Sequence, residues 1–598
     1  MGQFSKFAML GLAMGLTGAT QAADITLSGN ITTSTTLTAN NVYNLSGEVR
    51  VLPGVTLTIE AGTVFATVSG ANQGTLAVAR GGKIFINGTK DKPVIMTSAA
   101  DRATWTANDP KTGTWRATAN EWGSLAIMGR AYISNTKNVA TNTSVPNANN
   151  VSPMEGLVAQ FVGDPNILYG GETDDDDSGS ISYLSIRYGG KVLALANELN
   201  GMSLGGVGRE TDIHHIEIMN NVDDGIEIFG GTVNIKYFSV WNIGDDSFDV
   251  DQGWRGKAQF GLIVTGYSLV ASSGSGFPDN GFEIDGAEKA DSQPVTASVL
   301  YNMTYIGVPE SIAANSADHA TEWRDNANVQ FRNCIFMDTG EDIVKGANGA
   351  SDGEGSNGYG FNGTLNWDVR WTTAFSHNHN AANPNAGGFL TAQLQALYPA
   401  QVDGNLIEIK DSVFFNNTDS TAYTEANTRQ VFAAQNNNVQ EPATSPIVAI
   451  ARTSTAPFGA TNGQGRTVHN VTNLDPRAAG DAITSVATAP NDGFFTQAKY
   501  RGAFSKDVNW LLGWTASHAF GFHAGQTNPA DPAVTLKVHL TTVSFLAANG
   551  VSYSIEKSTN GLTWTPVSGL VGDGTTKTIS DVLGASFEAT VLYRVIMN

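Results

Sequence analysis

Apolar and polar residues alternate strictly in many short runs of this chain, as in the run from Val55 to Ile59. A period of two places the apolar side chains on one face of a strand, so each run predicts a half-buried β-strand. Gly, Asn, Asp, Ser and Thr fill the stretches between the runs, which is typical of turns. The pattern therefore predicts an all-β protein with almost no helix.

One of these patterns repeats. The run from Asp223 to Gly230 is echoed by Asp245 to Asp251 and, after a Gly/Ser-rich excursion, by Asp279 to Gly286. A repeat of roughly 22 residues that holds short strands between turns is one coil of a solenoid. A single coil cannot bury its own inward side chains, so successive coils must stack. We therefore expect a right-handed parallel β-helix.

The coils define the expected domains. Residues 23–527 form the β-helix, interrupted by long polar insertions near 101–177 and 346–400. A Pro/Asp-rich joint at Asn528 to Pro532 precedes a small C-terminal β-sandwich over residues 533–598.

The open ends of a solenoid need covering, because unpaired strand edges associate. We expect Ser28 to Asn44 to cover the first end and Phe494 to Phe522 to cover the last, with Trp510 and Trp514 packing there.

Residues 1–22 are typical of a secretory signal peptide. Lys6 gives a short basic region, an uncharged apolar stretch follows, and Thr20 to Ala22 offers small residues for cleavage before Ala23. The apolar stretch is too short to span a membrane, and we expect no transmembrane segment after it. The protein is therefore expected to be exported, to the cell surface, the medium or the periplasm.

Charge narrows the range of partners. The chain has 34 basic and 55 acidic residues, a formal net charge of −21. This balance argues against nucleic acid and anionic membranes and favours cations, or substrates approached through a bound cation. Cys334 is the only cysteine, so no intramolecular disulfide is expected.

Several motifs resemble a large family of exported β-helix proteins that are common in Bacteroidetes, Verrucomicrobia and related Gram-negative bacteria. The similar segments are Val55 to Val64, Ala79 to Ile84, Trp122 to Gly129, Leu204 to Gly208, Asp224 to Gly231, Leu474 to Arg477, Gly502 to Phe504 and Gly513 to Thr515. The end of the chain, through Tyr553 to Asn560 and Trp564, is similar to short C-terminal β domains of verrucomicrobial exported proteins. The resemblance implies a fold and a surface location and brings no established activity. Many members are lipoproteins, whereas this chain lacks the anchoring cysteine.

The repeats predict a row of stacked carboxylates. If the apolar residues of each copy point inward, then Glu227, Asp249 and Glu283 point outward on adjacent strands, and Asp251 and Asp285 do so one step along. A further coil at Thr321 to Asp325 places Glu322 beside Glu283 and Arg324 beside Asp285. Carboxylates about 4.8 Å apart repel by roughly 3 kcal/mol near a protein surface, which a cation would relieve.

Three interpretations of this row remain open from the sequence. It is a solvated acidic face, or a Ca²⁺ site, or a catalytic pair of Asp249 and Glu283 with Arg324 as a base. The candidate calcium ligands are Glu227, Asp249, Asp251, Glu283 and Asp285 in the row, and Asp175 and Asp176 in a separate acidic loop.

Other candidates carry weaker signals. His214 and His215 should point to opposite faces of a strand, which argues against joint metal binding, and His377 and His379 lack a third ligand.

Trp105, Trp115 and Trp122 form either a sugar-stacking platform or the packing of the first insertion.

Function divides into two hypotheses. The first is an exported structural or binding protein, adhesin-like or matrix-like, that is stabilised by cations and binds polysaccharide or envelope components. The alternative is a carbohydrate-active enzyme, a polysaccharide lyase or a glycoside hydrolase that uses the acidic row.

Overall fold

The structure is a computed structural model of the chain. It describes residues 23–70, 74–134, 150–194, 197–269, 279–287, 293–308, 319–346, 365–375, 396–398, 403–417, 431–453, 469–529, 540–558, 564–582 and 592–597. The chain divides into two compact units, residues 1–527 and 528–598, and each is considered by itself. The expected signal peptide, residues 1–22, lies outside the described residues.

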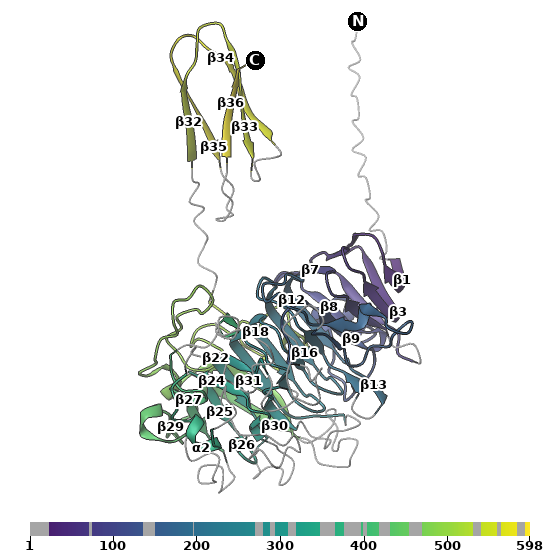
Figure 1. The fold of residues 1–598 in the computed structure, drawn as a ribbon, viewed down its shortest axis with the longest axis vertical. Helices are drawn as coiled ribbons and strands as arrows, with labels where there is room; N and C mark the ends of the chain where they lie inside the picture. Colours follow the sequence, from purple (N-terminus) through teal and green to yellow (C-terminus); the bar gives the residue numbers. More distant parts are fainter. Residues whose placement is uncertain are drawn as a thin grey trace, which may run out of the picture. The chain divides into compact units, whose positions relative to one another are not determined.

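The first unit is a right-handed parallel β-helix (Figure 1). Successive coils pair in parallel with the register that the repeat predicts, because Ile226 lies opposite Phe248 and Phe248 opposite Phe282. These inward side chains are fully buried, as the alternation of apolar and polar residues requires. The core is a continuous apolar column that also contains Cys334.

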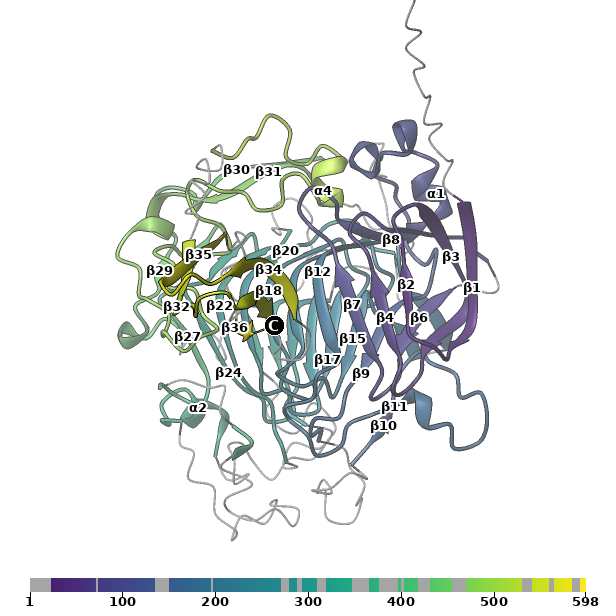
Figure 2. The same cartoon turned by 90° about the horizontal axis from the view of Figure 1, so that it is seen from above.

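One face of the β-helix, which we call the ladder sheet, carries the acidic repeats. Its strands pair in sequence order from the second half of β3 (Asn41–Val51) onward. They are β6 (Thr75–Val78), β9 (Ser124–Met128), β15 (Met202–Gly205), β17 (Ile226–Phe229), β19 (Phe248–Asp251), β21 (Asn280–Ile284), β23 (His319–Trp323) and β26 (Val344–Gly346). Figure 2 shows β9, β15 and β17 side by side. Strand β9 falls inside the first expected insertion, so residues 101–177 contain one coil strand between two excursions.

The remaining parallel strands close the coils. The shorter ones are β2 (Thr35–Leu37), β4 (Thr56–Ile59), β5 (Val64–Thr67), β7 (Lys83–Asn87), β8 (Val94–Ser98), β24 (Asn328–Arg332), β25 (Ile335–Met337), β27 (Glu408–Lys410), β28 (Val413–Phe415) and β29 (Val439–Gln440). The longer ones are β12 (Gly179–Arg187), β16 (Asp212–Met219), β18 (Asn234–Trp241), β20 (Lys257–Val264) and β22 (Ala297–Ile306). Each longer strand bends once and serves two faces of the coil.

The bends hold a column of stacked rings. Tyr183, His215, Tyr237 and Phe260 occupy equivalent positions, each with a positive φ between 48° and 61° that turns the strand. Ring centroids lie 4.3 Å apart from Tyr183 to His215, 4.5 Å to Tyr237 and 4.8 Å to Phe260. Such φ values cost free energy for non-glycine residues, and ring stacking offsets part of that cost.

Residues 469–527 form a strap along the side of the β-helix. The strap begins with β31 (Asn470–Ala478), which pairs with β30 (Ile447–Thr453). Trp510 then packs edge-on against His215 and Tyr237, and Trp514 against Tyr183 and His215. The expectation that Phe494 to Phe522 covers the last end is therefore wrong, because the bend column offers these aromatic residues a long apolar face.

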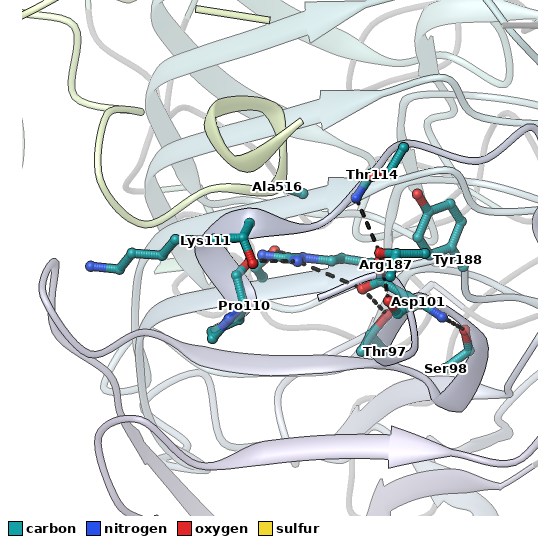
Figure 3. Close-up of polar contacts among 12 residues, drawn as sticks. Thr97, Ser98, Asp101, Pro110, Lys111, Thr114, Arg187, Tyr188 and Ala516 are labelled. Carbon is teal, nitrogen blue, oxygen red and sulfur yellow. Dashed lines mark hydrogen bonds and ion pairs between the residues drawn. The ribbon is translucent and has the colours of Figure 1, made fainter. Parts of the chain in front are cut away.

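The strap also meets the first insertion, which contains α1 (Ala99–Arg102), η1 (Thr106–Asn108) and η2 (Pro110–Thr112). The strap helix α4 (Ala516–Ala519) lies beside η2. Figure 3 shows Arg187 buried between them, with Nη1 3.6 Å from Asp101 Oδ2 and donating to the Pro110 carbonyl oxygen. Its guanidinium faces the ring of Trp105 at 5.9 Å and that of Phe520 at 5.6 Å.

The described remainder of the first unit consists of short elements. They are β10 (Ser152–Pro153) paired with β11 (Leu168–Tyr169), the hairpin of β13 (Lys191–Ala194) and β14 (Asn197–Leu199), α2 (Trp367–Arg370), η3 (Pro165–Ile167), η4 (Ala434–Asn436) and η5 (Gly480–Ile483). No helix among the described residues is long and apolar enough to cross a membrane.

The second unit contains two antiparallel sheets, as expected for a small sandwich. Strand β32 (Leu540–Leu546) pairs with β35 (Thr576–Val582), and β33 (Ser552–Ser558) lies between β34 (Thr565–Val571) and β36 (Leu592–Met597). Ile555 is fully buried, and Phe545 packs on Tyr553 with ring centroids 5.0 Å apart.

Candidate functional site

The stacked carboxylates form one column on the outer face of the ladder sheet. Glu227 pairs in register with Asp249, and Asp249 pairs with Glu283. Glu322 continues the column in the next coil, and Ser203 precedes Glu227 in the coil before. The structure thus brings together the residues that the alternation placed on this face.

The column is not an open, solvated surface. Glu227 and Glu283 are each 7% exposed and Asp285 is 8% exposed, while Asp249 and Asp251 are half-buried. A freely solvated acidic face does not fit this burial, because buried charges need a compensating partner or a bound proton.

Part of the first insertion walls the column at one end. Tyr169 packs on Phe229 of β17 with ring centroids 5.5 Å apart, and its hydroxyl donates to Gln252 Oε1 at 2.9 Å. A Cβ on Gly205 would lie 2.4 Å from the ring of Tyr169, so the strand accepts this close contact only through glycine. Met154 and Leu199 join the same apolar cluster. The insertion is therefore built onto the ladder sheet beside the acids.

Carboxylates from the preceding turns complete the site. Ligand oxygens of Asp223, Asp224 and Asp245 lie within 4.8 Å of one another, and so do those of Asp224, Glu227 and Asp249. One Ca²⁺ with ligands at 2.3–2.6 Å brings its oxygens to within about 5 Å of one another. We call the acidic cluster the set Asp223, Asp224, Glu227, Asp245, Asp246, Asp249, Asp251, Glu283 and Asp285.

The backbone of the turns ties the coils together through the same acids. Asp224 Oδ1 accepts a hydrogen bond from the Asp246 amide at 2.8 Å, and Asp246 Oδ1 accepts one from the Asn280 amide at 2.6 Å. Each of these carboxylates has a second oxygen that these bonds leave available. One oxygen of Asp249 is buried and makes no hydrogen bond within the described residues.

Burial changes the acidity of the whole cluster. It raises the pKa of Asp224, Glu227 and Asp249 well above their usual range, and the neighbouring carboxylates raise it further. The pKa of Asp245 rises to about 9 and that of Asp246 to about 8, again chiefly through burial. Without a cation, Asp245 and Asp246 therefore hold protons at neutral pH.

Two acidic residues of the walls add to the negative charge of the cluster, and no sequence pattern pointed to them. Glu155 and Glu198 both raise the pKa of Asp223, and burial raises the pKa of Glu155 to about 7. Glu155 lies in the insertion and Glu198 on β14, so only the folded walls bring them to the cluster.

Basic side chains lie at the far end of the column. Arg324 donates from Nε and Nη2 to the two oxygens of Asp285, both at 2.8 Å, and it also pairs with Glu283. Lys345 Nζ donates to Glu322 Oε2 at 3.0 Å. Arg324 is thus a counterion with two of its donors engaged, and a role as base would require this pairing to break.

The sequence reasoning also missed His319. His319 begins β23, where it lies opposite Asn280 of β21, and it is 7% exposed. Its ring nitrogens lie 3.7 Å from Glu341 Oε2 and 3.6 Å from Asp342 Oδ2. Burial lowers the pKa of His319 to about 3, so the ring is neutral.

Among the residues that the structure describes, Asp175 and Asp176 belong to no group of three converging ligands. Asp175 pairs with Arg209 at 2.8 Å, and Asp176 accepts from the Ser178 hydroxyl at 2.9 Å. The adjacent Asp174 pairs with Arg255 at 2.6 Å. Basic residues that lie far away in the sequence supply the charge that a cation would otherwise provide.

The two neighbouring histidines do not point apart. The positive φ of His215 interrupts the strand alternation, so His214 Nδ1 and His215 Nδ1 lie 2.9 Å apart. Among the described residues, no group of three ligands includes either ring. His377 and His379 lie outside the described residues.

The three tryptophans of the first insertion pack inward. Trp105 is 9% exposed, Trp115 4% and Trp122 0%. Trp115 Nε1 donates to Asn220 Oδ1, and Trp122 Nε1 donates to the Arg187 carbonyl oxygen. The packing interpretation fits this burial, and the sugar-stacking platform does not.

Residues 29–357 match the model of the pectate-lyase-like β-helix domain, which is more than half of the chain. The chain belongs to this family. The matched span contains every residue of the acidic cluster, together with Arg324 and His319. No curated protein and no solved structure gives a significant match to the chain.

Proposed function

We propose that this pectate-lyase-like β-helix protein is exported and binds Ca²⁺ in the acidic cluster. In this proposal the loaded cluster is a binding surface for acidic polysaccharide of the cell envelope or matrix. The observation that carries the proposal is the convergence within 4.8 Å of oxygens from Asp224, in the turn before β17, and from Glu227 and Asp249 on the paired strands β17 and β19.

The chemistry of the ligands supports calcium over softer metals. The converging groups are carboxylates, and Ca²⁺ takes six to eight oxygen ligands in flexible geometries. Zinc and copper favour imidazole or thiolate ligands. Among the described residues, the groups of converging ligands contain neither histidine nor cysteine. Stacked coils hold the ligand strands in fixed register, so a bound ion would also join two adjacent coils.

Charge supports an anionic glycan as the partner. When more than one divalent ion fills the cluster, the ions add positive charge to an otherwise acidic protein. They also keep open coordination positions that a ligand can occupy. Uronate carboxylates are hard oxygen ligands that fill such positions, whereas neutral glycans gain little from them. The walls provided by Tyr169 and Leu199 limit where a polysaccharide chain lies on the ladder sheet.

Calcium titration of the purified, EDTA-treated protein tests the first half of the proposal. We expect heat of binding by calorimetry and a higher melting temperature, since a ligand at a hundredfold excess over its Kd stabilises by about 2.7 kcal/mol. The Glu227→Gln/Asp249→Asn variant should lose both effects. Asp175→Asn is the matched control, because Asp175 already pairs with Arg209. Absence of binding by the unaltered protein contradicts the proposal.

Cosedimentation with polygalacturonate tests the second half. Binding should require Ca²⁺ and disappear with EDTA and in the Glu227→Gln/Asp249→Asn variant, and a neutral glucan should not bind. Calcium binding without polygalacturonate binding would restrict the role of the ion to stability.

A second candidate is a carbohydrate-active enzyme, favoured by family membership and by Arg324 at the end of the acidic column. Incubation with acidic polysaccharides separates the candidates through reducing ends and the ultraviolet absorbance of unsaturated uronate. Turnover that is lost in Asp249→Asn and Glu283→Gln would establish the enzyme, and binding without turnover would establish the non-catalytic role.

A further inference from the structure

The first coil leaves a strand edge open. Strand β1 (Ala23–Ile31) pairs in parallel with β3 and with no other strand among the described residues. Ser28 to Asn44, expected from the sequence to cover this end, instead form part of the first coil. Figure 2 shows β1 as the outermost of the purple strands. Its outer edge therefore carries backbone donors and acceptors that no described strand satisfies.

The end of the core is also incompletely covered. Ile25, Leu27 and Ile31 point toward the core but are only half-buried, whereas Tyr43 and Leu45, their neighbours on β3, are buried. A further strand laid against β1 would remove this apolar surface from water.

The edge carries one bulge, between Ser28 and Asn30, but it lacks the charged residues and prolines that also protect open strands. From Ile25 to Gly47 the chain contains no charged residue and no proline. Natural sheets blunt exposed edges with lysine, proline, bulges or covering segments. The charge of Asp24 is already paired with Arg102 at 2.9 Å.

A cluster of exposed apolar side chains lies beside the edge. Gln160 and Asn30 exchange hydrogen bonds between their side chains, which fixes the loop around Gln160 next to β1. Val158 is 55% exposed, Phe161 57%, and Val162 is fully exposed. Contiguous exposed apolar residues beside an unpaired edge mark a protein interaction surface.

From these observations we infer that β1 pairs with β1 of a second copy of this chain. The pairing is antiparallel and two-fold symmetric, so that each copy presents the same surface to the other. It joins the two apolar cores through Ile25, Leu27 and Ile31 of both copies. The loops that carry Phe161 flank the new strand pair.

The uncharged edge suits a second copy, because two identical edges meet there without opposing like charges. With a net charge of −21, two copies repel each other over most of their surfaces. From Ile25 to Gly47 the chain has no charge, so this edge adds no repulsion of its own. A basic partner would gain little here, since it would be attracted to the acidic faces instead.

Sedimentation of the purified protein, with its N-terminus at Ala23 verified by mass spectrometry, tests the inference. We expect a concentration-dependent monomer–dimer equilibrium with no larger species. Thr26→Lys/Ser28→Lys places like charges opposite one another across the pair and should raise the dimer dissociation constant by at least about tenfold. Phe161→Ser/Val162→Ser removes the flanking apolar contact and should weaken the dimer without altering the edge.

Thr444→Lys/Thr484→Lys is the matched control, because it adds the same charge at exposed positions away from the edge. This variant should dimerise like the unaltered protein. A monomer at all concentrations overturns the inference, and so does a dimer that neither the edge variant nor the Phe161→Ser/Val162→Ser variant weakens. A monomer that appears only when residues 1–22 are retained would show that this segment covers the edge instead.

Discussion

The carboxylate of Glu217 accepts a hydrogen bond of 2.9 Å from the backbone amide of Ser517, and its other oxygen accepts from Ala516. Glu217 is fully buried on β16 and also accepts from the Ser185 hydroxyl at 2.8 Å. Negative charge at the first turn of α4 is favourable, because the free amides of the helix point at it. One side chain thus fastens the strap to the middle of the β-helix.

We predict that Glu217→Ala detaches this part of the strap. Two buried amides lose their acceptor, which should lower the free energy of unfolding by about 2–5 kcal/mol. Chemical denaturation measures the loss, and hydrogen exchange should rise in residues 510–525. Glu60→Ala is the control at an exposed position and should change neither quantity.

We predict that Asn220 stabilises the fold in two ways, by adopting a positive φ and through its side-chain hydrogen bonds. Its φ is 58°, its Oδ1 accepts from Trp115 Nε1, and its Nδ2 donates to the Arg116 and Thr118 carbonyl oxygens. We expect Asn220→Gly to destabilise through the lost bonds alone. Asn220→Ala should cost roughly 1–2 kcal/mol more, because alanine resists positive φ. Equal melting temperatures for the two variants would contradict this division.

The acidic cluster predicts a pH dependence of definite sign. Folding raises the pKa of Asp245 to about 9 and that of Asp246 to about 8, both from an ordinary value of 3.8. Their contribution to stability is complete below that unfolded value and is lost as pH rises through the folded values. The calcium-free protein should therefore melt at progressively lower temperature as the pH is raised from about 5 to about 9.

Calcium should reverse this trend by replacing protons. Binding near neutral pH should release protons, so the calorimetric enthalpy should vary with the ionisation enthalpy of the buffer. The stabilisation by Ca²⁺ should also grow with pH. A melting temperature that rises with pH in EDTA, or binding without proton release, would contradict the protonated cluster.

Arg324 offers a separate test. Arg324→Gln removes the charge that pairs with Asp285 and Glu283, leaving their carboxylates uncompensated. The calcium-free protein should become less stable, and the affinity for Ca²⁺ should increase, because the ion then supplies the missing positive charge. Calorimetry and thermal melting measure both effects. Weaker calcium binding in this variant would show that Arg324 positions the ligands instead of competing with the ion.

The periodic features of the fold were predictable from the sequence. Spacing between the copies at Asp223 and Asp245 set the register, and alternation placed Glu227, Asp249 and Glu283 in one outer column. Both follow from local geometry, because strand side chains alternate and identical coils stack in phase.

What the sequence did not reveal depends on distant contacts. Glu155 and Glu198 reach the cluster only after the insertion and hairpin pack on the ladder sheet, and Arg209 neutralises Asp175 from another coil. The bend at His215 breaks the alternation on which its predicted direction rested. The position of the strap could not be predicted from the sequence, because aromatic residues pack equally well on the side of a solenoid and on its end.

The strap affects the order in which parts of the protein finish folding. Coils of a solenoid gain their neighbours one after another, so the early coils are ready to fold while the chain is still emerging. Here, however, the rings of Tyr183, His215 and Tyr237 receive their cover from residues some 270 to 330 positions later. A chain that crosses a membrane N-terminus first would hold this aromatic flank uncovered until its last third arrives. Chaperones that hold apolar surface should therefore bind the nascent protein there and leave when the strap docks.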